Sequence, residues 1–264
     1  SFNEPYTKNY YSHSAFDDYP VVGISWKQAV AFTKWRTLMI NKFRKASKQP
    51  ILPDFRLPTE SEWEYASRGG LDLSPYPWGG PYTRNNKGCF LANFKPLRGN
   101  YTADGGIKSI KVGSYNPNGY GLFDMAGNVS EWTLDMHDVR AYQKYSGIIV
   151  TNPYEKPTKL YPRVVRGGSW MNSNFKLRSA SRQASSKQWK KQDPQIPRSE
   201  WWHTDAQFVG FRVIRPFVTP PVCPPLSVVL EETRVPKLAA VRTAPPTASS
   251  IFQTPSIFSC LMAP

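Results

Sequence analysis

The stretch between residues 70 and 215 restricts the possible folds most, because residues that favour turns interrupt it every few positions. Glycine reaches positive φ without strain, and asparagine and aspartate bond their own backbone. Strand-like runs are few, namely Val164–Val165 and Phe208–Ile214, the latter with apolar residues at 209, 211 and 213. So much irregular backbone needs buried aromatic side chains or bound metal to hold it. The turn segments are Trp78–Gly80, Asn85–Gly88, Asp104–Gly106 and Asn116–Gly119.

Two helices are expected ahead of this stretch. Ser25 and Gln28 have the spacing of a capping box, in which each side chain accepts a hydrogen bond from the other residue's backbone N–H. A second, shorter helix is expected to open at Thr59 and to stop at Gly69–Gly70, where glycine can end a helix in the left-handed conformation. We expect one face of the first helix to be apolar and buried, with Trp35 flanking it: Ala29, Phe32, Met39 and Phe43.

The composition changes sharply near residue 219. Every Gly, Trp and Tyr lies before that point, and residues 219–264 hold 9 of the 25 prolines. Proline fixes φ and removes a backbone donor, which discourages helices and central strands. The sequence therefore predicts a folded domain over residues 1–218 and a Pro-rich linker or disordered tail over residues 219–264.

The chain is strongly basic, with 34 Lys and Arg against 19 Asp and Glu, a formal net charge of +15. Such an excess suits nucleic acid, an anionic lipid surface or an acidic protein partner, and is also found in soluble proteins without such partners. The aromatic residues are not interleaved with the longest basic run, so nucleic-acid binding is not expected. No apolar run approaches the ~18 residues that span a bilayer.

Few residues have the spacing of a known catalytic or soft-metal site. The three histidines are scattered, and the chain has no nucleophile elbow, no P-loop and no dinucleotide-binding motif. Without a neighbouring base, Cys89 is expected to be a small buried apolar residue. Oxygen ligands are the better lead, because Asp124 and Glu131 flank a glycine turn. Such a turn can point carboxylates and backbone carbonyls at one centre, and calcium requires oxygen ligands of these kinds. Aspartate also favours turns for its own hydrogen bonds, so this pattern alone is weak.

Several motifs, taken in order, resemble the formylglycine-generating enzyme (sulfatase-modifying factor) family over about residues 20–215. The resemblance implies a C-type-lectin-like α+β fold with little regular secondary structure. The family's enzymes oxidise a sulfatase cysteine to formylglycine, using two cysteines that bind copper shortly after a Gly-Gly-Ser-aromatic motif. The segments that carry the resemblance are Arg56–Ala66, Tyr76–Gly79, Asn118–Trp132, Arg166–Trp170 and Gly210–Arg212.

The chain departs from the enzymes where their chemistry takes place. Residues 170–178 contain no cysteine, and amide or apolar side chains cannot replace thiolates in soft-metal chemistry. Ser130 stands where catalytic members carry an aromatic residue in the substrate groove. Ser169 matches the family's active-site serine, and we expect it to be a turn residue. The sequence therefore predicts no oxidase activity, no copper and no catalytic residues.

The resemblance also implies two structural calcium sites. The first would use the side chains of Asn93 and Asp104 with the carbonyls of Phe94 and Gly106. The second would use the side chains of Asp124 and Glu131 with the carbonyls of Gly127 and Val129. Calcium is the expected cofactor in both.

Three further segments resemble the GldK/PorK lipoproteins of Bacteroidota: Asn3–Thr7, Asp18–Gly23, and Lys87–Pro96 with Gly99–Tyr101. That family implies a non-catalytic subunit of the type IX secretion and gliding machinery, forming a ring with a GldN/PorN protein at the periplasmic face of the outer membrane. Its signal and lipidated cysteine lie in an N-terminal part that this chain lacks, and membrane attachment is expected only through that anchor. The related GldJ proteins share much of the pattern.

One basic segment is the expected partner contact. It has six cations and no acid, and it follows the Gly-Gly-Ser motif, which suits an acidic partner surface. A solvated basic loop is the alternative. The other function left open is a formylglycine-generating-type oxidase or another enzyme of the same fold. The six residues are Lys176, Arg178, Arg182, Lys187, Lys190 and Lys191.

Overall fold

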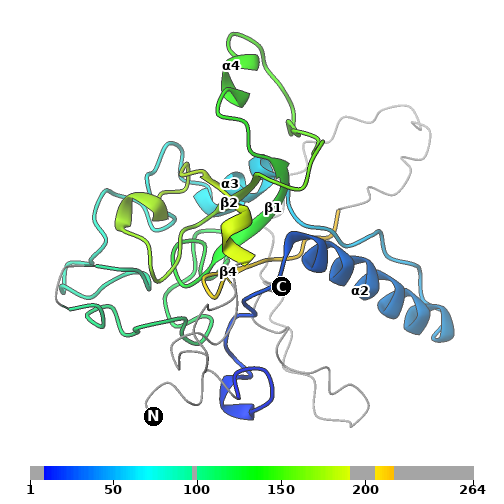
Figure 1. The fold of residues 1–264 in the computed structure, drawn as a ribbon, viewed down its shortest axis with the longest axis horizontal. Coiled ribbons are helices and arrows are strands. Elements are labelled where there is room, and N and C mark those ends of the chain that lie inside the picture. Colours follow the sequence, from blue (N-terminus) through cyan, green and yellow to red (C-terminus); the bar gives the residue numbers. More distant parts are fainter. Residues whose placement is uncertain (1–8, 97–99, 191–205, 217–264) are drawn as a thin grey trace, which may run out of the picture.

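The computed structural model describes residues 9–96, 100–190 and 206–216, and of Lys190 only the backbone. Figure 1 shows a small central sheet, a long helix that projects to one side, and loops that make up much of the rest. In chain order the elements are η1 (Ser14–Phe16), α2 (Trp26–Ala46), α3 (Glu60–Arg68), β1 (Ser130–Met136), α4 (Ala141–Lys144), β2 (Arg163–Arg166), η2 (Asn174–Leu177), β3 (Gln183–Ala184), η3 (Lys187–Lys190) and β4 (Val209–Gly210).

Both helix starts and the end of the second helix agree with the sequence prediction. Ser25 caps α2, and its capping box with Gln28 is complete. Thr59 and Glu62 form the same arrangement at the start of α3. Helix α3 ends at Gly69, whose φ of 58° lies in the left-handed region that glycine tolerates.

The buried face of α2 differs from the expected one. Its buried residues are Ala29, Thr33 and Thr37, whereas Met39 and Phe43 are 42% and 50% exposed. The reason is that only the first half of α2 packs on the sheet. The second half lies against the extended segment 50–56, where Asn41 and the Thr37 hydroxyl bond the backbone of Leu52 and Phe55.

The sheet has the order β3-β2-β1-β4. Strands β1 and β2 are antiparallel, with Glu131 opposite Arg166, and β2 and β3 are also antiparallel. Strand β4 is parallel to β1 and pairs Val209 with Ser130. The sheet thus joins segments from residues 130 to 210, and its mixed pairing with few helices agrees with the expected α+β architecture.

The main hydrophobic core lies between the sheet and the first half of α2. It is formed by residues from six segments, among them Ala29 of α2, Trp132 of β1 and Phe211 after β4. Phe32 packs edge-on against Phe211, with ring centroids 5.5 Å apart. A second cluster, with Tyr76 and Phe94, joins the loops around these two residues to Leu177 of η2.

The strand predictions were partly right. Strand β2 confirms Val164–Val165, but the run from Phe208 to Ile214 forms only the short β4 and an isolated bridge from Ile214 to Arg56. Strand β1 was not predicted from the sequence. Residues 219–264, where a linker or tail is expected, lie outside the described residues. Within the described residues, no helix is long and apolar enough to cross a membrane.

Candidate functional site

The turn after β2 holds Ser169, the residue that matches the family's active-site serine. Ser169 is fully buried. Its backbone N–H and its hydroxyl both donate to Oδ1 of Asn172, at 3.0 and 2.9 Å. The backbone N–H of Asn172 donates back to the carbonyl of Ser169 at 2.9 Å. This closed turn uses the hydrogen-bonding groups of Ser169 internally, which confirms the expectation of a turn residue.

The segment after this turn folds back on it. A Cβ at Gly168, whose φ is +69°, would lie 2.8 Å from the backbone oxygen of Lys176 in η2. Leu177 is fully buried and packs in the cluster of Tyr76 and Phe94. Backbone and apolar side chains therefore fill the space around Gly168 and Leu177, within the segment where the resemblance implies the enzymes' cysteines.

Cys89 differs from its expected placement. It is exposed, and it lies in a small loop that a bridge between Arg84 and Phe90 closes. The backbone N–H of Cys89 donates to the side chain of Asn85, which orders the loop without burying the thiol. The prediction of a buried cysteine was wrong, because the turn sequence around it sits at the surface.

Ser130 opens β1 in the interior. It is 1% exposed, and its hydroxyl has no hydrogen-bond partner among the described residues. Its backbone N–H donates to the carbonyl of Phe208. The position where catalytic members carry an aromatic residue in a groove is therefore covered in this chain.

The first expected calcium site comes together as a cluster. The backbone N–H of Phe94 and, at 3.5 Å, that of Gly106 point to the carboxylate of Asp104. A Cβ at Gly106 would lie 3.5 Å from Nδ2 of Asn93, which places this turn beside Asn93. Asn93 uses Nδ2 to bond the carbonyl of Lys108 at 2.8 Å.

Two observations support the prediction of a hard cation in this cluster. Oδ1 of Asn93 is buried without a hydrogen-bond partner among the described residues. Asp104 is 7% exposed, and burial raises the pKa of its carboxyl despite the backbone donors. A buried amide oxygen without a partner beside a poorly compensated carboxylate is the donor set that calcium favours. Asn93, Asp104 and the carbonyls of Phe94 and Gly106 would hold the ion.

The second expected site is arranged differently. Both carboxylate oxygens of Glu131 accept hydrogen bonds from Arg212, and one also accepts from the indole of Trp63 at 2.7 Å. Asp124 accepts from the backbone N–H of Gly113 at 2.8 Å. Burial raises the pKa of the Asp124 carboxyl, while the charge of Arg212 acts in the opposite direction.

In this arrangement the residues of the second expected site do not fit a cation, because the guanidinium of Arg212 already supplies the positive charge beside Glu131. Calcium could enter only if Arg212 moved away. The carbonyls of Gly127 and Val129 remain expected ligands under that condition. Gly127 also approaches the first site closely, since a Cβ there would lie 2.4 Å from the backbone oxygen of Asn93. The second site therefore stays a prediction.

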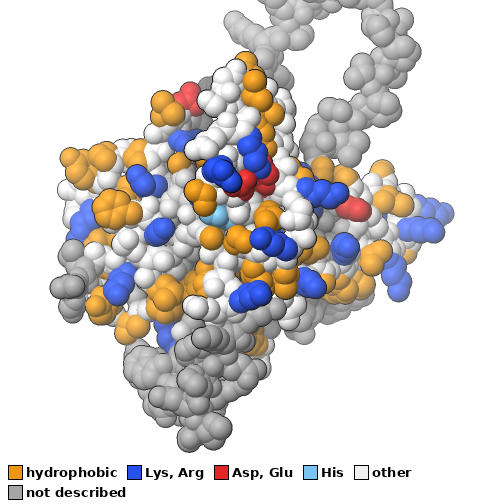
Figure 2. Space-filling view, turned by 45° about the horizontal axis from the view of Figure 1, so that its top comes forward, with side chains coloured by type: hydrophobic (Ala, Val, Ile, Leu, Met, Phe, Trp, Pro, Cys, Tyr) orange, Lys and Arg blue, Asp and Glu red, His pale blue; other side chains and the backbone are white. Residues whose placement is uncertain are grey.

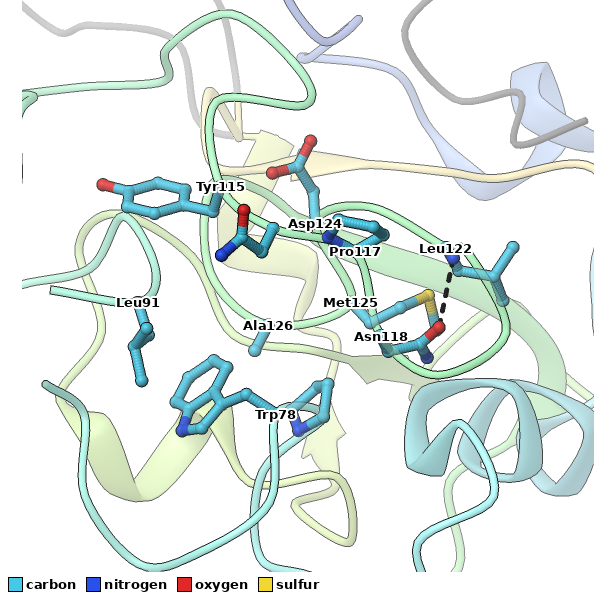
Figure 3. Close-up of a pocket in the computed structure, with 11 residues that line it drawn as sticks. Trp78, Leu91, Tyr115, Pro117, Asn118, Leu122, Asp124, Met125 and Ala126 are labelled. Atoms are coloured by element: carbon cyan, nitrogen blue, oxygen red, sulfur yellow. Dashed lines mark hydrogen bonds between the residues drawn. The ribbon is translucent and has the colours of Figure 1, made fainter. Parts of the chain in front are cut away.

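The pocket next to Asp124 is too small for an organic ligand. Figure 3 shows Trp78, Tyr115 and Asn118 around it, with the bond from Leu122 to Asn118 dashed. Its volume of about 20 Å³ has room for about one water molecule.

A larger cavity of about 310 Å³ lies at the start of α2 and is lined in part by Trp26, Trp132 and Trp189.

The basic segment divides into exposed and paired residues. Lys176, Arg178 and Lys187 are exposed. Arg182 instead pairs with Glu60, with Nε and Nη2 at 2.5 and 2.8 Å from the two carboxylate oxygens, and donates to the carbonyl of Asp138. Its guanidinium is thus held in an internal ion pair, and its expected role as a partner contact stays a prediction. The side chain of Lys190 and all of Lys191 lie outside the described residues.

Little in the sequence indicates the ion cluster around Arg182. Arg166 is fully buried, bonds Glu64, and has Nη1 3.6 Å from Glu60. Asp135 accepts the backbone N–H of Glu60 at 2.7 Å, and burial raises its pKa to about 6. Glu60 and Glu64 lie on one face of α3, which was the only available signal. Arg68 of α3 also bonds Glu64, whereas the other partners, Arg166, Asp135 and Arg182, come from two later strands and a loop.

Comparison with known proteins gives a consistent result. A formylglycine-generating enzyme from Streptomyces coelicolor is 36% identical over 155 residues, which cover 58% of this chain and 43% of that enzyme. The inactive C-alpha-formylglycine-generating enzyme 2 of Bos taurus is 32% identical over 157 residues, covering 59% and 40%. The chain thus spans less than half the length of these curated relatives.

Structure comparison supports the same fold. The structure of PvdO from Pseudomonas aeruginosa superposes with a TM-score of 0.53 at 23% identity, covering 76% of this chain and 63% of that one. The family model for the sulfatase-modifying factor enzyme 1-like domain matches residues 3–216. This match covers most of the sequence and includes every element described above. The chain therefore belongs to the formylglycine-generating enzyme-sulfatase (sulfatase-modifying factor enzyme 1-like) domain family.

Proposed function

We propose that this chain is a non-catalytic member of its family that works by binding other proteins. Its specific role would be that of a GldK/PorK-type subunit of the type IX secretion and gliding machinery, in a ring with a GldN/PorN-type protein. The ring would lie at the periplasmic face of the outer membrane, and a lipid anchor outside this chain would attach it. The domain would have the C-type-lectin-like form of the fold.

The observation that carries the proposal is the closed turn at Ser169. In the enzymes a reactive centre follows this serine, whereas here Asn172 takes both of its hydrogen bonds. The chain has no cysteine between Cys89 and Cys223, so the segment that follows the turn supplies no thiolate. The one sulfur side chain in residues 170–178 is the thioether of Met171, which cannot supply the pair of thiolates that the resemblance implies for the enzymes.

Relatives make a non-catalytic role reasonable for this family. By its name, the Bos taurus relative is an inactive form, while the Streptomyces coelicolor relative is an enzyme. The family domain therefore persists with and without the activity. The secretion-machinery role rests on the three segments that resemble GldK/PorK proteins, Asn3–Thr7, Asp18–Gly23 and the run from Lys87 to Tyr101.

The exposed part of the basic segment is the proposed partner contact. Lys176, Arg178 and Lys187 are exposed, while Leu177 and the Ser169 turn hold the backbone beneath them in place. Lysine and arginine on a rigid turn attract an acidic surface and speed association. Calcium at the first site would hold the neighbouring loops and would take no part in a reaction.

The first experiment is an affinity capture from detergent-solubilised envelopes of a bacterium with type IX secretion, using the full chain as bait. We expect a GldN/PorN-type protein as the main stoichiometric partner. A variant with Lys176, Arg178 and Lys187 changed to Ser should capture several-fold less. A matched variant with Lys87, Lys156 and Lys159 changed to Ser should capture as much as the wild type. Equal capture by both variants rules out the basic segment as the contact.

The second experiment tests the enzyme alternative. The full chain is incubated with a peptide carrying a sulfatase motif, with and without copper, and the peptide mass is measured. We expect an unchanged cysteine in the peptide. Formation of formylglycine contradicts the non-catalytic proposal and favours an oxidase with an unrecognised active centre.

A further inference from the structure

We propose that the outer half of α2 is a docking surface for anionic lipid bilayers. This inference goes beyond the proposed function and does not rest on it. It concerns the part of the helix that leaves the sheet, from about residue 34 to its end at Ala46. In Figure 1 this half of α2 extends away from the rest of the molecule.

The first observation is the charge of the helix. Helix α2 contains six Lys or Arg and no Asp or Glu between Trp26 and Ala46. Lys34, Lys42 and Lys45 are exposed, and in the part of the chain that the structure describes none of them is in an ion pair. The nearest following acid, Asp54, lies on the extended segment that packs against the helix. These three exposed lysines therefore give the outer half of α2 a positive surface.

The second observation is the apolar surface beside that charge. Trp35, Leu38 and Met39 are 45%, 70% and 42% exposed. These residues occupy neighbouring turns of the helix, next to Lys34 and Lys42, because positions three and four apart share a face. Figure 2 shows Lys or Arg and hydrophobic side chains close together at the projecting end. A helix with this combination lies in the interface of a membrane.

The third observation is that the helix is held firmly without using this surface. Thr33 and Thr37 face inward and are buried, and Asn41 bonds the backbone of Leu52 in both directions. Trp35 lies against Phe32, with ring centroids 5.5 Å apart, and Phe32 packs on Phe211 of the core. The exposed residues are therefore presented on a rigid support, which lowers the entropy cost of binding.

A bilayer suits this surface better than nucleic acid does. Leucine and methionine gain from hydrocarbon contact, whereas nucleic acid rewards planar aromatic rings that stack on bases. The exposed apolar surface of this half mixes two aromatic residues, Trp35 and Phe43, with the aliphatic Leu38 and Met39. Lysines beside apolar residues instead match the phosphate headgroups above an acyl layer. If this holds, the expected attachment through a lipid anchor alone is incomplete.

The test is co-sedimentation of the full chain with vesicles of phosphatidylcholine containing one third phosphatidylglycerol. We expect binding that falls steeply with salt and is lost with phosphatidylcholine alone. Changing Lys34, Lys42 and Lys45 to Gln should weaken binding by about fivefold per lysine. Changing Trp35 and Leu38 to Gln should weaken it by about tenfold.

Two matched controls separate this surface from the general positive charge. The variant K87Q/K156Q/K159Q removes the same charge elsewhere, and L73Q/Y82Q removes side chains that are 91% and 75% exposed. Both should bind vesicles like the wild type. Equal losses in the α2 and control lysine variants overturn the proposal, as does the absence of vesicle binding. Binding to duplex DNA instead of vesicles, with the same dependence on α2, also overturns it.

Discussion

Arg212 and Glu131 form a two-point ion pair inside the protein, with Nε and Nη2 at 2.6 and 2.8 Å from the two carboxylate oxygens. Glu131 is 1% exposed and Arg212 is 8% exposed. The pair joins the middle of the sheet to the segment after β4. Because each charge is shielded from water, each depends on the other for its compensation.

Changing Glu131 to Gln should lower the free energy of unfolding by about 3–5 kcal/mol, because it leaves the buried Arg212 without a counter-charge. Urea denaturation followed by tryptophan fluorescence measures the loss. As a control, Asp18→Asn breaks an exposed pair with Lys111 at 3.6 Å and should change stability by less than about 1 kcal/mol. A loss in E131Q as small as in the control contradicts the buried pair. The double variant E131Q/R212M should recover part of the loss.

Asp135 should make stability depend on pH between about 4 and 6. Burial raises its pKa to about 6, and the charge of Glu60 adds to this while Arg182 opposes it. The folded state therefore keeps a proton that the unfolded state loses near pH 4, so this group's contribution falls as the pH rises through 6. The change is about 2–3 kcal/mol at most.

Asp135→Asn checks this dependence. The amide cannot ionise, so its stability curve should be flatter than that of the wild type between pH 4 and pH 6. The backbone N–H groups of Glu60 and Glu155 each donate to one oxygen of Asp135, and an amide has only one oxygen to accept them. The variant therefore loses one of these two hydrogen bonds and should be less stable than the wild type at low pH. Parallel curves for the two proteins show that another group is responsible.

Calcium should stabilise the domain through the first site. At a concentration about a hundred times its Kd, calcium should raise the free energy of unfolding by about 2.7 kcal/mol. Asp104→Asn should abolish the increase, whereas Asp72→Asn, which changes an exposed acid, should keep it. The melting temperature with calcium and with a chelator measures both. If D104N keeps the increase and D124N loses it, the ion occupies the second site after Arg212 has moved.

Asn172→Ala should cost about 1–3 kcal/mol, because the buried hydroxyl and the backbone N–H of Ser169 lose their common acceptor. Ser173→Ala is the control, since Ser173 precedes η2 without a side-chain capping bond. It should change stability by a few tenths of a kcal/mol. Thermal unfolding of the two variants gives the comparison, and equal losses contradict the role of Asn172.

The features predicted correctly from the sequence are those whose cause is local. A capping box depends on four consecutive residues, so Ser25 and Thr59 were found, and Gly69 marks a helix end by its own conformation. Strand β1 was missed because it is buried on both faces and includes Glu131 and Asp135, which look like surface residues. Their partners, Arg212 and the backbone of Glu60, are more than seventy residues away.

The same limit explains the errors at the site. Arg182 looked like one of six similar cations, and only its contact with Glu60 shows that it is held in an internal ion pair. The buried residues of α2 include Thr33 and Thr37 instead of Met39 and Phe43, because the outer half of the helix lies against an extended segment and not against the sheet. The turn at Ser169 could be predicted, since the absence of cysteine in the following residues removes the alternative role.

The parallel pairing of β1 with β4 also determines the order in which the domain can be completed. Strand β1 is one of the two inner strands, yet its neighbour on one side is Val209–Gly210, about eighty residues later. During synthesis β1 and β2 can pair early. Until residues 209–212 have been made, one edge of β1 has no partner strand, Phe211 is missing from the core, and Glu131 lacks the counter-charge of Arg212. A ribosome-bound chain that stops before residue 209 therefore exposes an unpaired strand and an uncompensated carboxylate, which a chaperone can recognise.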